Sequence, residues 1–318
     1  MKSRKAACGL KTINALPDEI LIEIFEFASH ANETPSKDEE IPIRDICQIC
    51  ATWRNLAIRI GRFWTKILIR LHWSLSRITE YWKTMSGRVG LLPITLSFSL
   101  TVGSQVTAAF VDDLRAMFKD AIFEGVHFLL AGEPHLYPAH QYLDAFDKLP
   151  RIRVEPLSED DDCQPSFDIG EFLLRCRPST WKLSVSVAVF HTRGDIGRLP
   201  LQISLKKLSL NSFEESFVPL RSILRQCVNL RSLSIEGKIQ VDETDNATLT
   251  SDHLQRLNAI RFDEIDVLAS LSDGGLSRVF PNLEHAFIGY TTTSQMGGLD
   301  LTTCKEYSET TKVTKRHQ

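Results

Sequence analysis

The stretch LPDEILIEIFEFA, residues 16–28, predicts the N-terminal helix around which the first part of the chain is organised. Pro17 and the two acids behind it are typical of a helix start, because proline lacks the amide that would be unsatisfied there and acids complement the positive end of the helix. Most other positions are apolar, whereas Glu19, Glu23 and Glu26 form one polar stripe. We therefore expect a helix that contacts protein on most of its sides.

A second helix is predicted behind an acidic segment, residues 28–42, which two prolines interrupt. Within residues 46–60 the apolar side chains recur at offsets of 0, 3, 4, 7, 10, 11 and 14, the spacing of an amphipathic helix. Gly61 fits a C-terminal cap, and Phe63 and Trp64 follow as two aromatic side chains that need cover. This unit of about 50 residues has more apolar surface than its own core can bury, so we expect it to contact another chain.

Length and composition restrict the class of protein. The 318 residues predict one extended or two compact domains. A net charge of −3 argues against a general nucleic-acid binder, which would have a basic surplus. Residues 1–12 are basic but lack the apolar core of a signal peptide, and we find no apolar run that predicts a membrane span. The seven scattered cysteines are expected to be reduced thiols of an intracellular protein.

A short pattern recurs beyond about residue 90: one apolar residue is followed by two more, at +3 and +5. Copies begin at intervals of about 27 residues, and those starting at Leu205 and Leu230 are the clearest. The last two apolar residues of each copy share one face of a short strand, and residues 217–230 supply a helix between two strands. The pattern predicts a leucine-rich-repeat solenoid, whose units bury their apolar faces against one another. An ordinary doubly wound α/β domain would show the same alternation and stays open as the alternative.

The opening stretch, together with DICQICATWRNLAIRIGRFWTKI at residues 45–67, resembles the F-box. Its general form is L-P-x-E-I/L-L, then I-F, later V/I-C-x-x-W-R and finally an aromatic residue before Trp. This chain departs from it in a longer loop between the first two helices and in Gly61, where a proline often stands. The layout is similar to that of the F-box proteins with irregular leucine-rich repeats of mushroom-forming fungi. The matching residues are Leu16, Pro17, Glu19, Ile20, Leu21, Ile24, Phe25, Cys50, Trp53, Arg54, Phe63 and Trp64.

The resemblance implies a non-catalytic adaptor of an SCF-type (cullin-RING) ubiquitin ligase, in the cytoplasm, the nucleus or both. The F-box would bind a Skp-family linker, the repeats would recruit a protein substrate, and no nucleic-acid or membrane partner is expected. The alternative is a leucine-rich-repeat scaffold outside any ligase. For Trp53 and Ile49, packing inside the domain competes with a linker contact. The implied linker contacts are Leu16, Pro17, Ile20, Leu21, Phe25, Trp53, Phe63 and Trp64.

The predicted fold is thus an N-terminal all-α F-box-like unit followed by an α/β leucine-rich-repeat solenoid. Residues 1–12 are expected to be a flexible tail, and residues 13–69 the F-box. Residues 70–90 would be a linker helix, residues 91–290 the repeat domain, and residues 291–318 a disordered tail.

Catalytic, metal and cofactor sites are not predicted. Cys47 and Cys50 form C-x-x-C, but a zinc site needs two more ligands at organised spacing, and both thiols fall on or beside the apolar face of a helix. The acidic run at residues 159–162 is interpreted as a solvated loop. We find no phosphate-binding, dinucleotide-binding, zinc-protease or serine-hydrolase motif in the sequence. Three histidines lack a compact ligand pattern: His127, His135 and His140.

Overall fold

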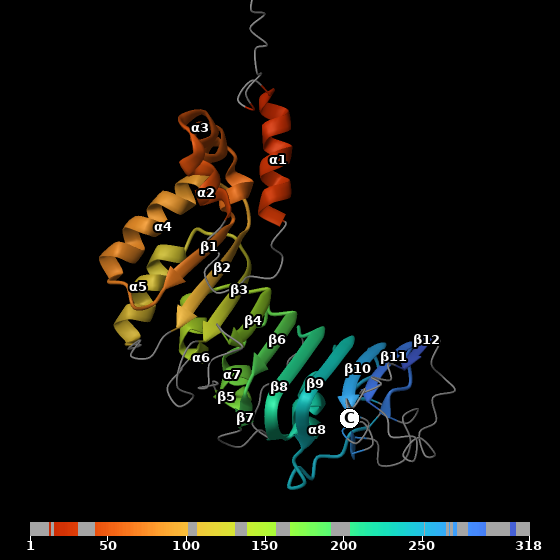
Figure 1. Ribbon diagram of the computed structural model, residues 1–318. Coiled ribbons are helices and arrows are strands. Elements are labelled where there is room, and N and C mark those ends of the chain that lie inside the picture. Colours follow the sequence, from red (N-terminus) through yellow and green to blue (C-terminus); the bar gives the residue numbers. More distant parts are fainter. Residues whose placement is uncertain are drawn as a thin grey trace, which may run out of the picture.

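The computed structural model describes residues 13, 16–30, 42–100, 107–130, 139–156, 166–191, 204–250, 252–264, 267, 270–271, 279–290 and 306–309. A ten-stranded sheet runs through it, with all neighbouring strands parallel and each strand beside its predecessor in the chain (Figure 1). Its strands are β1 (Lys66–Arg70), β2 (Ile94–Leu100), β3 (Phe123–Leu130), β4 (Arg151–Pro156), β6 (Lys182–Val187), β8 (Lys207–Val218), β9 (Ser232–Val241), β10 (Ala259–Glu264), β11 (His285–Tyr290) and β12 (Glu306–Glu309). A second, two-stranded sheet pairs β5 (Ser166–Asp168) with β7 (Val189–His191).

Helices precede the sheet and then alternate with its strands. Before β1 come α1 (Asp18–His30), α2 (Pro42–Ile49), α3 (Ala51–Arg59) and the short 3-10 helix η2 (Gly61–Trp64). The connections between later strands contain α4 (Leu75–Val89), α5 (Ala108–Phe118), α6 (Ala139–Tyr142), η3 (Leu143–Ala145), α7 (Ile169–Arg175) and α8 (Leu220–Gln226). Helices α4 to α8 lie along the same side of the sheet (Figure 1).

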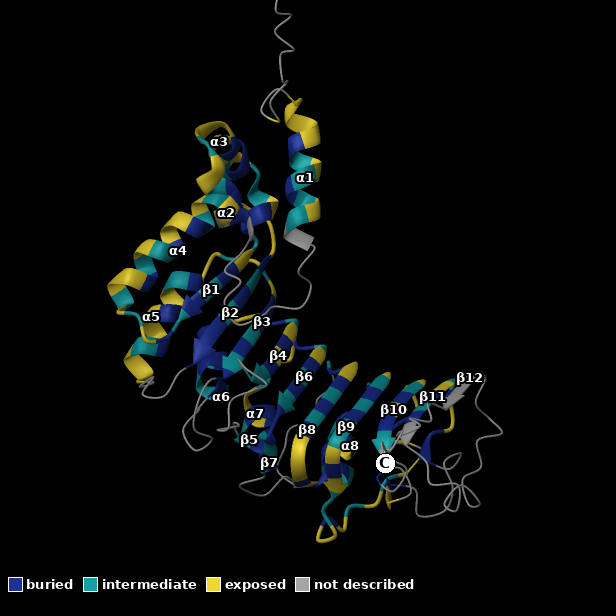
Figure 2. Cartoon of the chain, viewed as in Figure 1, coloured by how far each residue is buried: buried dark blue, intermediate teal, exposed yellow. Residues whose placement is uncertain are grey.

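The alternation of residue types along each strand explains this one-sided cover. In β6, Leu183 and Val185 are buried, whereas the flanking Lys182 is exposed and Ser184 is only partly covered. Figure 2 shows the same banding of buried and exposed positions along neighbouring strands. Because side chains point alternately to the two faces of a strand, the apolar residues meet the helices and the polar residues line the open face.

Local signals fix the helix ends. The Ser74 side chain caps α4 by accepting a hydrogen bond from the Arg77 amide at 3.4 Å. Gly90 ends the helix with a φ of +66°, a conformation that glycine adopts without strain. Beneath α4 and α5 the rings of Trp82 and Phe118 lie 4.8 Å apart, so aromatic packing holds these helices on the first strands.

The predicted fold class is wrong: the chain does not form an all-α F-box-like unit followed by a leucine-rich-repeat solenoid. Residues 66–70, expected to close the helical unit, are strand β1 of the large sheet and pair with β2. The connections also do not repeat one unit: α4 has 15 residues and α8 has 7, and the described residues between β9 and β10 form only turns and irregular structure. The apolar pattern at +3 and +5 detects strands covered on one face, and such strands occur in any α/β sheet of this kind.

The alternative of an α/β domain is closer to the structure. The strand order of the large sheet nevertheless follows the chain, without the reversal that a doubly wound sheet has. The predicted linker helix at residues 70–90 corresponds to α4, which crosses from β1 to β2. Residues 1–12 lie outside the described part of the chain, and of residues 291–318 only 306–309 are described, as β12 beside β11.

Glycine at position 237 is required by the sheet. Its φ is +73°, and a Cβ there would lie 2.0 Å from the carbonyl oxygen of Ser212 on β8. Gly87 in α4 has open space around it. We expect Gly237→Ala to lower the free energy of unfolding by at least about 2 kcal/mol, and Gly87→Ala to raise it by about 0.5–1 kcal/mol. Urea unfolding of the two variants tests this, and equal effects would contradict the described register of β8 and β9.

Candidate protein-docking surface

Helix α1 packs onto the molecule through one face. Leu21 and Phe25 on that face are 1% and 0% exposed. The Phe25 ring lies 5.0 Å from the ring of Trp53 in α3 and 6.2 Å from that of Phe63 in η2. Three helical segments thus meet at one aromatic cluster, in which edge and tilted ring contacts add to the burial of apolar area.

The opposite face of α1 is open and carries apolar side chains beside exposed glutamates. Ile20 is 41% exposed and Phe27 is 80% exposed. These two residues are seven positions apart, about two helical turns, and so share a face, whereas Phe27 and Phe25 point to opposite sides. Leu16, four residues before Ile20, is 38% exposed. We call Leu16, Ile20 and Phe27 the outer face of α1, with Leu16 in the bend that precedes the helix and the exposed Glu23 between Ile20 and Phe27. Exposed large apolar side chains that gather in one place are a typical feature of a protein contact.

Trp64 joins the N-terminal helices to the sheet. Its indole N–H donates a hydrogen bond to the Ala57 carbonyl oxygen at 2.9 Å, and the Arg88 guanidinium of α4 lies 4.2 Å from the ring centroid. Trp64 is 2% exposed. A buried indole with a satisfied N–H and a cation over its face is a stable anchor, so Trp64 fixes α3 against α4.

The eight predicted linker contacts therefore fall into two groups. Leu16, Pro17 and Ile20 are exposed. The remaining five are buried within the protein: Leu21, Phe25, Trp53, Phe63 and Trp64. The structure brings together the buried group as a core and places the exposed group on the outer side of α1. Trp53 thus packs inside the domain, as its alternative role required.

Phe27 was not predicted as a contact, and Ile49, for which packing inside the domain was the competing role, is 58% exposed. Phe27 could have been found from its helical spacing to Ile20, since seven residues return to the same face. The role of Ile49 could not be decided, because sequence spacing placed it on the apolar face of one longer helix. In the structure that helix is interrupted at Cys50, which has extended backbone angles and caps α3.

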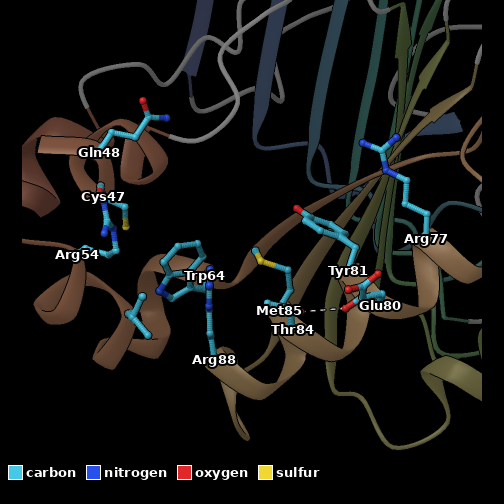
Figure 3. A pocket seen from close by; sticks show the side chains of 11 residues that line it. Cys47, Gln48, Arg54, Trp64, Arg77, Glu80, Tyr81, Thr84, Met85 and Arg88 are labelled. Carbon is cyan, nitrogen blue, oxygen red and sulfur yellow. Dashed lines mark hydrogen bonds between the residues drawn. The ribbon is translucent and has the colours of Figure 1, made fainter. Parts of the chain in front are cut away.

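A hollow of about 500 Å³ lies between the N-terminal helices and α4 (Figure 3). Its apolar wall includes Trp64, Tyr81 and Met85. Among its arginines, Arg54 donates from Nε to the Cys47 carbonyl oxygen at 2.9 Å. The other two arginines lie over tryptophan rings: Arg77 over Trp73 at 4.5 Å and Arg88 over Trp64 at 4.2 Å. These cations therefore already serve the packing of the walls.

The C-x-x-C pair serves the same local structure. The Cys50 sulfur accepts a hydrogen bond from the Trp53 amide at 3.5 Å, which caps α3. Burial raises the pKa of the Cys47 thiol, with Arg88 and Arg54 opposing the shift, so Cys47 is less acidic than a free thiol. In the described part of the chain no group of His, Cys, Asp and Glu side chains could hold a metal ion.

His127 and His140, the two of the three histidines that the structure describes, lie in partly buried positions. The Nε2 atom of His127 lies 2.7 Å from a carboxyl oxygen of Glu155 across strands β3 and β4. Burial lowers the pKa of His140, with Arg175 contributing in the same direction. His135 and the acidic run at residues 159–162 lie outside the described residues. Among the helices that are described, none combines the length and apolarity that crossing a membrane requires.

Neither a family model nor a curated protein matches this chain. The function must therefore be inferred from the residues of the chain and from their placement. In this region large apolar side chains stay in contact with water at the outer face of α1 and at Ile49.

The two buried tryptophans provide a matched test of this packing. The Trp53 indole nitrogen is buried and has no hydrogen-bond partner among the described residues, whereas that of Trp64 donates to the Ala57 carbonyl oxygen. We expect Trp64→Phe to lower the free energy of unfolding by about 1 kcal/mol more than Trp53→Phe, because only the former breaks a buried hydrogen bond. Urea unfolding measures the difference, and a larger loss in Trp53→Phe would show that Trp64 does not anchor α3.

Proposed function

We propose that the protein is a substrate-recognition adaptor of an SCF-type (cullin-RING) ubiquitin ligase. The outer face of α1 docks on a Skp-family linker, and the sheet domain holds a protein substrate. The observation that carries the proposal is the exposed outer face of α1, formed by Leu16, Ile20 and Phe27. It lies opposite the face that packs on Trp53. Leu16 and Ile20 are also positions at which the sequence resembles the linker-binding motif of F-boxes.

The adaptor role fits the chemistry of the described residues. Burying the surface that is still exposed would contribute on the order of 1 kcal/mol each for Leu16 and Ile20, which are 38% and 41% exposed, and on the order of 2 kcal/mol for Phe27, which is 80% exposed. The protein would then accelerate ubiquitin transfer by holding a substrate close to the loaded enzyme, which raises the local concentration of its lysines. Such a role needs no catalytic group, metal or cofactor in this chain, and it places the protein in the cytoplasm or nucleus.

A non-catalytic scaffold outside any ligase is the second candidate. It is favoured by the five predicted contacts that are buried in the chain's own core. On this alternative residues 13–69 would be well protected from hydrogen exchange in the isolated protein, without any added linker. The outer face of α1 argues for the adaptor, since a docked partner would cover its three exposed apolar side chains.

The adaptor hypothesis predicts which apolar residues matter for binding. Leu16→Ala with Ile20→Ala should weaken binding of a purified Skp-family linker about tenfold or more, because two buried side chains are lost from the interface. Isothermal titration calorimetry measures the affinity.

A matched control removes exposed apolar side chains elsewhere. Leu91 and Ile122, which precede β2 and β3, are 89% and 54% exposed. Leu91→Ala with Ile122→Ala should leave the linker affinity within about twofold of the wild type. The proposal fails if the wild-type protein does not bind the linker, or if the two double variants lose equal affinity.

A further inference from the structure

The turns before the strands repeat one backbone arrangement. The Pro150 carbonyl oxygen accepts hydrogen bonds from the amides of Trp181 and Lys182, at 2.9 and 3.3 Å. The Trp181 carbonyl oxygen accepts likewise from Lys206 and Lys207, at 2.9 and 3.0 Å. Because each turn is tied to the next in this way, equivalent residues stand in rows along the amino ends of the strands.

The arrangement continues by one more strand, where the Lys206 carbonyl oxygen accepts from the amides of Arg231 and Ser232 at 2.8 and 3.1 Å. The rows thereby gather five exposed cations over β4, β6, β8 and β9. We call this set the basic rim: Arg151, Lys182, Lys206, Lys207 and Arg231. In Figure 2 the amino ends of β4, β6 and β8 are coloured as exposed along one edge of the sheet.

Three of these cations are direct cross-strand neighbours. Arg151 pairs in register with Lys182, and Lys182 pairs with Lys207. Adjacent strands are about 4.8 Å apart, and like charges directly opposite one another destabilise a sheet. The folded protein therefore maintains an unfavourable charge arrangement, in a chain whose net charge is −3.

Little in the described structure neutralises the basic rim. Arg151 Nη1 lies 2.8 Å from a carboxyl oxygen of Glu124, and its guanidinium lies 5.0 Å from the Trp181 ring centroid. The other four cations form no ion pair with any residue that the structure describes. The nearby Arg153 is already paired with Glu155. The rim thus offers four uncommitted cations to an outside partner.

Small side chains lie next to the basic rim. Two residues further along the strands, on the same face, Ser184 pairs with Ser209 and Ser209 with Ser234. This row is part of the open face of the sheet, and short hydroxyl side chains let a chain approach closely. From β4 to β9 the sheet spans three strand spacings, about 14 Å, which four or five residues of an extended peptide would cross.

We propose that the basic rim binds an acidic segment of a protein partner, laid across strands β4 to β9. Carboxylates of the segment pair with Lys182, Lys207 and the two cations of the turns, and its backbone passes over the serine row. A single-stranded nucleic acid fits less well. Proteins that bind one usually stack several bases on aromatic side chains, whereas Trp181 is the one aromatic residue among the turn positions equivalent to Lys206. The partner is a substrate segment if the proposed adaptor function holds; the binding chemistry does not depend on it.

Fluorescence anisotropy with a labelled peptide of about ten alternating Glu and Ser residues tests the proposal on the full chain. We expect the wild type to bind, more weakly as salt rises, and Lys182→Glu with Lys207→Glu to weaken binding about tenfold or more. The control Lys83→Glu with Lys238→Glu makes the same charge change at exposed positions in α4 and in the carboxyl half of β9. It should stay within about twofold of the wild type.

Three outcomes would overturn the proposal: no binding by the wild type, equal loss in both variants, or tighter binding of a single-stranded RNA of equal charge than of the peptide. Urea unfolding shows whether the rim variant is folded, and Lys182→Gln with Lys207→Gln gives a milder change, with an intermediate loss of peptide affinity expected. Linker affinity measured on the same proteins separates the two proposals, since the rim variant should bind the linker like the wild type.

Discussion

The structure depends on one constraint: the strands from β1 to β11 in the large sheet bury one apolar face. Leu183, Leu208 and Leu233 lie side by side in register, and all are buried. Helices must cover that face, so α4 to α8 gather on one side (Figure 1). The other face carries serine and charged residues, and the parallel register places equal positions of successive strands next to one another. The basic rim is a consequence of this register, because three cations at the same strand position become neighbours.

The N-terminal helices extend this core. Trp64 holds α3 against α4, and Phe25 holds α1 against α3, so α1 is attached at one face. Arg62 of η2 adds an ion pair to Glu26 of α1. A helix held in this way keeps its second face available, which is the geometry that an adaptor needs. The outer face of α1 is apolar and the basic rim is charged, so the two surfaces suit partners of different chemistry.

Local features were predictable from the sequence. The helix start at residues 16–19 and most strands were found, since Leu208 and Leu210 are buried two apart as the pattern required. Strand β1, which lies outside the repeating pattern, was missed. Its buried Ile67 and Ile69 alternate with less buried residues as a strand requires, but the segment directly follows predicted helix. In β10 the two buried residues are Ile260 and Phe262.

Non-local features were not predictable. The apolar positions of α1 cover so much of its circumference that the sequence does not tell which side packs on Trp53 and which stays open. The rim cations come from four segments, and only the register of the sheet brings them together. The same limit explains the wrong fold class, since an apolar pattern reports that a strand is covered on one face but not how successive strands and helices are connected.

Hydrogen exchange of the full chain, with and without a saturating purified Skp-family linker, tests the central claim most directly. The account predicts that amides of residues 16–30 exchange more slowly in the complex, while those at the amino ends of β4 to β9 are unchanged. Unchanged exchange in α1, or protection confined to the sheet, would contradict a docking role for the outer face of α1.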